Sequence, residues 1–200
     1  ADIISDGHDV MEAVVQYKYE KDKKWSEVRM NALPNDAFEA TFSVEKQGYY
    51  SYHVEAWIDY ALNWQYGIGK KINDNQHVKS ELLEGVEYIK PLVSKVSASD
   101  KKYLNEVVDL FSNEANYEKA IIEAVSDKLK NIFKENPAKF LANQTQELRV
   151  YVDRQKALFS TWYEFFPRSA SSVEGKHGTF KDCEQILPKV AKMGFDTLYF

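Results

Sequence analysis

The side chains in this sequence with the widest chemical use are carboxylates, but their number alone does not make a site. Transfer or cleavage of a glycosidic bond needs two carboxyl groups facing one sugar bond, about 5–5.5 Å apart when configuration is retained. Among the 31 acidic residues, we examine Glu164, which lies within an apolar run, residues 159–166. Buried charges are usually paired. We therefore expect Glu164 to be an ion-paired residue at the end of a strand and not a catalyst.

A glycine-containing segment has part of the pattern of a phosphate-binding loop. Gly67-Ile68-Gly69-Lys70-Lys71 resembles the end of that loop. The full pattern also needs a glycine five residues before Gly69 and a Ser or Thr after Lys70. Trp64 and Lys71 occupy those positions. We interpret the segment as a turn that leaves a β-domain.

The histidines and the single cysteine lack partners at the spacings that bind metals or activate nucleophiles. There is no H-x3-H pair and no CxxC pair, so we expect neither a metal site nor a cofactor. His53 falls on the polar side of a predicted strand and is interpreted as a surface residue. Cys183 is interpreted as a half-buried helix residue. The four histidines are His8, His53, His77 and His177.

Two tryptophans suggest a different kind of site. Trp57 and Trp64 flank Asp59 and Asn63. Exposed aromatic rings can stack on sugar faces, with the polar groups hydrogen-bonding to hydroxyls. Tryptophan is also a normal core residue of a β-sandwich, so packing is the expected role. Exposure of both rings on one concave face would favour carbohydrate binding, and burial would favour a scaffold.

Composition limits the classes of function. The 200 residues include 26 basic and 31 acidic side chains, a formal charge of −5, and 44% hydrophobic residues, as in globular proteins. No run approaches the roughly 20 apolar residues of a membrane span, and the acidic balance disfavours duplex nucleic acid as a partner. A lone cysteine fits a reducing compartment. We expect a cytoplasmic protein that binds neither membrane nor nucleic acid.

The first part of the chain has the period-2 alternation of β-strands. Several short strands joined by short turns indicate an antiparallel β-sandwich, which we assign to residues 1–72. Strand character returns at 147–152, so residues 146–157 are expected to rejoin this domain. The expected strands are near 12–20, 25–30, 37–44 and 49–58.

From residue 73 onward, apolar residues recur at helical spacing, which predicts an inserted helical bundle over 73–145. The first helix carries Val78 to Ile89. Ser99 is expected to cap the second. The third spans about 117–133 and should end before Pro137, because the residue before a proline is disfavoured in the helical region.

The last part, residues 158–200, predicts a strand, a helix and a second strand. The strands are expected at 159–166 and from Phe195 onward, with the helix over 180–193. Pro188 should kink that helix or break it, and Gly194 should follow it in the left-handed region. A strand–helix–strand unit is the repeat of parallel α/β folds. We interpret these residues as the beginning of a truncated (β/α)8 barrel.

Three stretches carry a resemblance to a known family. Trp25 to Met30, Asp36 to Phe42 and Gly48 to Trp57 look like the N-terminal sandwich module of α-amylase-superfamily enzymes. The continuation, Trp64-Gln65-Tyr66-Gly67 and Lys70-Lys71, is more particular. The most specific stretch is Val150-Tyr151-Val152-Asp153-Arg154 followed by the residues from Phe159 to Ser169, and it continues with 177–182 and 193–199. Together they resemble the maltosyltransferases that use α-maltose 1-phosphate and α-1,4-glucan.

The resemblance implies an architecture and a reaction. The implied fold is mixed α and β: an immunoglobulin-like sandwich with a helical insertion, then a catalytic (β/α)8 barrel. The enzymes of this family move a maltosyl unit from α-maltose 1-phosphate to α-1,4-glucan with retention, using a carboxylate nucleophile and a carboxylic acid. Those catalysts lie on later barrel strands, so no catalytic, cofactor-binding or metal-ligating residue is assigned in this chain.

The resemblance also implies a homodimer to which the sandwich and insertion contribute. The chain is then expected to be an inactive scaffold and dimerisation region of a glycosyltransferase. Two alternatives are a glucan-binding module and the N-terminal part of another α-amylase-superfamily glycosidase.

Overall fold

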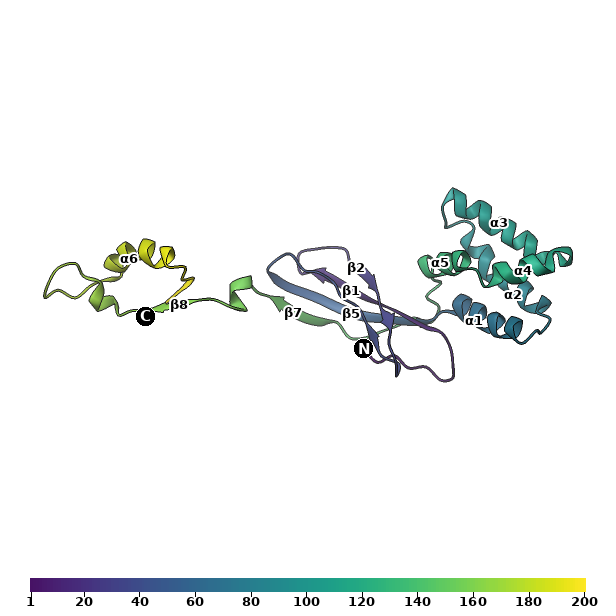
Figure 1. Ribbon diagram of the computed structural model, residues 1–200, viewed down its shortest axis with the longest axis horizontal. Helices are drawn as coiled ribbons and strands as arrows, with labels where there is room; N and C mark the ends of the chain where they lie inside the picture. The colour runs from purple at the N-terminus through teal and green to yellow at the C-terminus, as the bar shows by residue number, and fades with distance from the viewer. The chain divides into compact units, whose positions relative to one another are not determined.

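The computed structural model describes residues 1–200, which divide into two compact units. One comprises residues 1–43 and 51–149, and the other comprises residues 44–50 and 150–200. The elements, labelled in Figure 1, include six α-helices and a mainly antiparallel sheet. The expected mixture of α and β structure is confirmed.

The larger sheet has strand order β2-β1-β5-β6, and β7 pairs with β5. Strands β1 and β2 are antiparallel with Val15 opposite Val28, and β5 and β6 are antiparallel with Glu55 opposite Gln144. The predicted return of the chain to strand structure near 147–152 is therefore confirmed. The strands are β1 (Met11–Tyr19), β2 (Ser26–Arg29), β5 (Gly48–Ile58), β6 (Asn143–Gln144) and β7 (Leu148–Val152).

The strand predicted over 37–44 is wrong for most of its length. Only β4 (Phe38–Glu39) forms there, and it pairs with β3 (Asn31–Ala32) in a separate two-stranded sheet. The alternation beyond it reflects side-chain packing: the Phe42 ring stacks on Tyr17 with centroids 4.2 Å apart. Phe38 itself is buried against Ala13 and Met30 in a small core.

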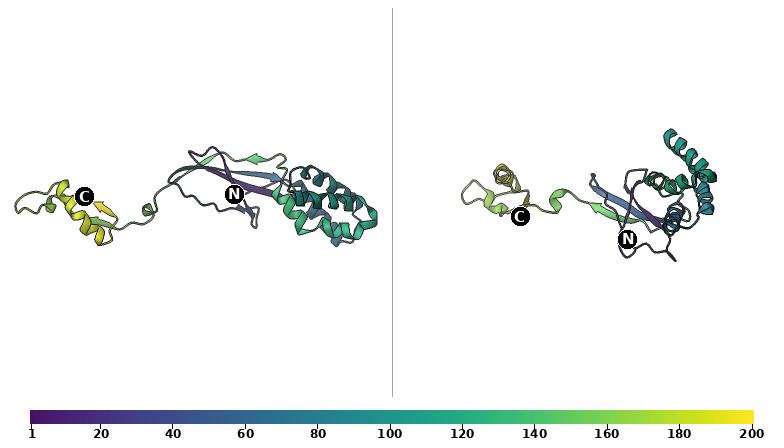
Figure 2. Two further views of the ribbon diagram at one scale, coloured as in Figure 1. Left: turned by 90° about the horizontal axis from the view of Figure 1, so that it is seen from above. Right: turned by 45° about the vertical axis from the view of Figure 1, so that its right-hand side comes forward.

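Five helices of the first unit share one apolar core, and Figure 2 shows them gathered side by side. The first begins at Tyr60 and not near residue 73, so the end of the region assigned to the sandwich is helical. Asp59 caps this helix by accepting a hydrogen bond from the Leu62 amide (3.1 Å). The helices are α1 (Tyr60–Asn73), α2 (Lys79–Ile89), α3 (Ala98–Ser112), α4 (Tyr117–Ala124) and α5 (Asp127–Glu135).

Helix boundaries differ from prediction where serines compete as caps. Ser97, not Ser99, caps α3 by accepting from the Asp100 amide. The long third helix is two helices, because Ser126 accepts from the Leu129 amide and starts α5 anew. The predicted stop before Pro137 is confirmed. Short 3₁₀ turns lie at Lys90–Leu92, Glu114–Asn116, Gln155–Ala157 and Pro167–Ala170.

The second unit contains the predicted strand–helix–strand order. β8 (Trp162–Glu164) and β9 (Thr197–Tyr199) are parallel, and α6 (Phe180–Lys192) connects them. The first strand is shorter than the predicted 159–166. Helix α6 runs through Pro188 without a break, and Gly194 follows with the expected positive φ of 88°.

Candidate functional site

The two tryptophans considered for sugar binding are buried. Trp57 is 2% exposed and Trp64 is 6% exposed. Their indole groups already have acceptors: Trp57 Nε1 donates to Asp59 Oδ2 (3.5 Å) and Trp64 Nε1 to the Glu81 carbonyl (2.7 Å). Asn63 donates to Asp9 (2.9 Å). These rings therefore pack the interior and offer no sugar-stacking face.

The sequence-based prediction for His53, on strand β5, was also wrong. His53 is buried, at 8% exposed, where the sequence predicted a surface residue. The ring of Trp25, on the neighbouring turn, lies edge-on to it with centroids 4.6 Å apart. The polar face of β5 is thus covered by side chains. Alternation along one strand does not reveal such a cover.

The remaining candidate residues occupy ordinary structural positions. Gly67 and Gly69 lie inside α1, so the segment is neither a turn nor a phosphate loop. Glu164 is exposed on β8. Cys183 is fully buried, not half-buried, and its Sγ donates to the Thr179 carbonyl.

The structure contains neither a grouping of metal ligands nor a membrane-spanning helix. No three His, Cys, Asp or Glu side chains gather closely enough to hold a metal ion. None of the helices has the length and apolar character needed to cross a bilayer.

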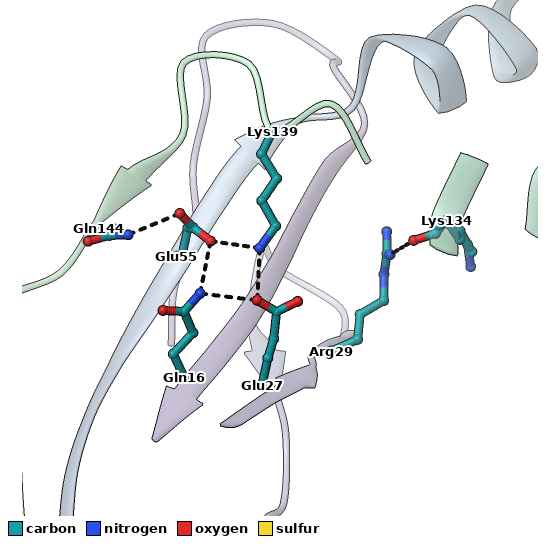
Figure 3. Close-up of polar contacts among 7 residues, drawn as sticks. All are labelled: Gln16, Glu27, Arg29, Glu55, Lys134, Lys139 and Gln144. Atoms are coloured by element: carbon teal, nitrogen blue, oxygen red, sulfur yellow. Dashed lines mark hydrogen bonds and ion pairs between the residues drawn. The ribbon is translucent and has the colours of Figure 1, made fainter. Parts of the chain in front are cut away.

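The densest polar cluster joins the helical insertion to the sheet, and Figure 3 shows its members. Lys139, which follows α5, places Nζ 2.9 Å from Glu27 Oε2 and 2.8 Å from Glu55 Oε2. Gln16 donates to the same two carboxylates (3.1 and 3.3 Å). Gln144 donates to Glu55 Oε1 (3.0 Å). We call these five residues the Lys139 cluster.

The electrostatics of the Lys139 cluster favour its charged form. Burial of Glu55 raises its pKa, but the hydrogen bonds from Lys139 and Gln144 and the Lys139 charge outweigh burial, so the net pKa is lowered. For Lys139, burial lowers the pKa, while the contacts with Glu27 and Glu55 raise it by more. Its ammonium also lies 4.9 Å from the centre of the Trp57 ring.

A second polar link runs from the sheet to α5. Arg29 donates through Nε to Glu12 Oε2 (2.7 Å), and Nη2 lies 2.6 Å from the same oxygen. Its Nη1 donates to the Lys134 carbonyl near the end of α5. The two links hold the insertion against the strands. Both links join residues that are far apart in the sequence, so the arrangement stabilises the fold.

Sequence reasoning missed the Lys139 cluster. Lys139 is separated by 112 residues from Glu27 and by 84 from Glu55. Its backbone has a positive φ of 47°. The sequence around Asn136-Pro137 does not predict this conformation for a lysine. The weak available signal was Glu55 on a strand interior, where a carboxylate requires a partner.

Known proteins of one family match this chain over its whole length. A family model described as α-1,4-glucan:maltose-1-phosphate maltosyltransferase, domain N/S, matches residues 1–154. The enzyme of that name from Chlorobaculum tepidum is 37% identical over 200 residues, covering 100% of this chain and 30% of the relative. The one from Methylacidiphilum infernorum is 35% identical over 199 residues, covering 98% of this chain and 29% of the relative.

A third relative, from Myxococcus xanthus, is 34% identical over 208 residues, covering 100% of this chain and 31% of the relative. The chain thus spans about 30% of the length of these curated relatives. The expectation drawn from the sequence motifs is confirmed: the chain belongs to the α-1,4-glucan:maltose-1-phosphate maltosyltransferase family and represents its N-terminal region.

Proposed function

We propose that this chain is the scaffold and dimerisation region of a retaining maltosyltransferase. The parent enzyme moves maltosyl units from α-maltose 1-phosphate to α-1,4-glucan, and carboxylates outside this chain perform the transfer. With the boundaries set by the start of α1 at Tyr60 and of β6 at Asn143, the proposed sandwich comprises residues 1–59 and 143–157, the helical insertion residues 60–142, and the first barrel elements residues 158–200. The same proposal places it in the cytoplasm, in keeping with its single cysteine.

The observation that supports the scaffold role is that the candidate binding side chains contact other parts of the same chain. The indoles of Trp57 and Trp64 are buried and hydrogen-bonded, and both carboxylates of the Lys139 cluster already pair with the Lys139 ammonium. Because both rings are buried, they do not support a glucan-binding module that depends on them. A different α-amylase-superfamily glycosidase is disfavoured by the relatives described above, which are all named maltosyltransferases.

Absence of turnover is the first expected result. The purified chain, given maltose 1-phosphate and a glucan acceptor, should release no phosphate above the buffer blank, because catalysis needs two facing carboxylates. A colorimetric phosphate assay measures this, with a full-length relative as the positive control. Turnover by the chain itself would contradict the proposal.

Self-association is the second expected result. The second unit exposes large apolar residues, among them Phe159 (77%) and Phe166 (73%), and such patches promote association. Sedimentation velocity over a wide concentration range should show dimers or larger species. Replacing both residues by glutamine should leave only the dimer formed by the first unit. A chain that stays monomeric throughout would contradict the dimerisation role.

A further inference from the structure

A cavity of about 540 Å³ lies between α1 and α5, beside the start of β1. This volume is within the range of small-molecule sites, roughly 300–1,000 Å³. Its apolar wall comes from Val10, Leu62, Ile72 and Val125. Its polar lining includes three lysines.

The cavity carries an excess of positive charge. Lys70 on α1 and Lys130 and Lys134 on α5 line it, together with two acidic residues, Glu12 and Asp127. Glu12 is already neutralised by Arg29 through two close contacts. Three lysines against the one remaining carboxylate leave two positive charges in excess, within a chain whose net charge is −5.

The three cavity lysines differ from the lysines that are paired elsewhere. Lys70 is placed over the Tyr66 ring, with Nζ 4.1 Å from the ring centre, and Tyr66 also lines the cavity. The ion pairs of the chain use other lysines, none of which lines the cavity: Lys71, Lys79, Lys90, Lys102, Lys139 and Lys156.

The spacing on α5 adds to the argument. Lys130 and Lys134 are four residues apart, so they lie one turn apart on the same side of the helix. Like charges at that spacing destabilise a helix. An anion held between the two ammonium groups converts their repulsion into attraction. Hydrophobic packing alone gives no reason for two lysines in this arrangement.

We propose that this cavity binds a small phosphate monoester, with its phosphoryl group at Lys130 and Lys134 and its uncharged body towards Tyr66 and the apolar wall. A phosphate monoester carries about −1.5 to −2 charges at pH 7, which matches the excess of two. A monocarboxylate would leave one charge uncompensated. This proposal does not depend on the proposed function.

Isothermal titration calorimetry of the 200-residue chain tests the proposal at low, matched ionic strength, since salt screens such contacts. The probes are glucose 1-phosphate, inorganic phosphate and glucose. We expect saturable binding of the ester and no binding of glucose. Equal binding of inorganic phosphate still supports the site and assigns recognition to the phosphoryl group alone. Binding of neither phosphate, or equal binding of glucose, overturns the proposal.

Two double variants that remove the same charge distinguish binding in the cavity from general electrostatic attraction to the chain. Lys130→Gln with Lys134→Gln should weaken ester binding about tenfold, the product of two modest exposed ionic contacts. Lys101→Gln with Lys119→Gln removes the same charge from exposed positions on α3 and α4 outside the cavity and should leave binding unchanged. Circular dichroism verifies that each variant is folded.

The pH dependence gives a second readout. Lowering the pH from 7 to 5 protonates the monoester, whose second pKa is about 6, so affinity should fall. Equal loss of affinity in the two double variants, or affinity that does not change with pH, overturns the assignment.

Discussion

Gly85→Ala should lower the free energy of unfolding of the helical insertion by about 2 kcal/mol. A Cβ on Gly85 of α2 would meet the Trp64 ring, with Cη2 at 2.7 Å and Cε2 at 2.8 Å. The ring cannot easily retreat, because its Nε1 donates to the Glu81 carbonyl and Phe111 and Phe133 pack against it. Overpacking of this kind costs about 1–3 kcal/mol or more, against a gain of about 1 kcal/mol in helix propensity.

Gly67→Ala on α1 is the matched control. A Cβ there has no heavy atom within 4 Å, so only the propensity gain of about 0.5–1 kcal/mol acts, and this variant should be more stable. Urea unfolding followed by the helical circular dichroism signal compares the two. Equal stabilisation by both substitutions would show that Trp64 does not define the α1–α2 packing.

The parts of the fold that local signals specify were predictable. The stop at Asn136-Pro137, the left-handed Gly194 and the return of the chain to strand structure near 147–152 each follow from backbone preferences or alternation over a few residues. The family resemblance was carried by contiguous stretches of sequence. These features need no knowledge of distant residues.

The errors occur where tertiary packing overrides a local pattern. The alternation around Phe42 is satisfied by stacking on Tyr17 and not by a strand ladder. The segment after Asp59 looked like a turn because of its glycines, yet it forms a helix whose apolar face enters the shared core. His53 looked exposed because the covering Trp25 is distant in sequence. Pairings at long sequence separation leave no periodic trace.

The candidate site was the least predictable part. The Lys139 cluster gathers residues from β1, β2, β5, β6 and the segment after α5, and only the folded chain brings them together. The sequence could indicate only that Glu55, on a buried strand, requires a cationic partner. Which lysine meets that need depends on where the insertion returns to the sheet.

Lys139→Met should lower the free energy of unfolding by about 2 kcal/mol at neutral pH. The Glu55 side chain is 12% exposed and that of Lys139 is 25% exposed, so removing the cation leaves a largely buried carboxylate beside Glu27. Breaking a buried pair costs about 3–5 kcal/mol, and the partial exposure of Lys139 reduces this. Methionine keeps an apolar chain over Trp57, which isolates the loss of charge.

A double-mutant cycle with Glu55→Gln measures the pair itself. We expect a coupling of about 1–2 kcal/mol, which lies within the range of about 0.5–3 kcal/mol for contacting residues of one polar network. The Glu87–Lys90 pair is the control: its side chains are 71% and 59% exposed, and exposed pairs couple by at most about 1 kcal/mol. Equal coupling in the two cycles would show that burial of the Lys139 cluster has no energetic consequence.

The pH dependence of stability follows from the direction of the two shifts. The pKa of Glu55 is lowered in the folded chain, so the unfolded chain binds the proton more readily at acid pH, and the stabilisation is present above the unfolded pKa of about 4.3. It is lost as the pH falls through the folded value. The pKa of Lys139 is raised, so Lys139 stays charged at every pH below about 10.4, and the loss of stability at acid pH comes from protonation of its carboxylate partner. Between pH 7 and pH 3 the chain should therefore lose stability that Glu55→Gln does not lose, and urea midpoints that fall in parallel for both proteins would contradict this assignment.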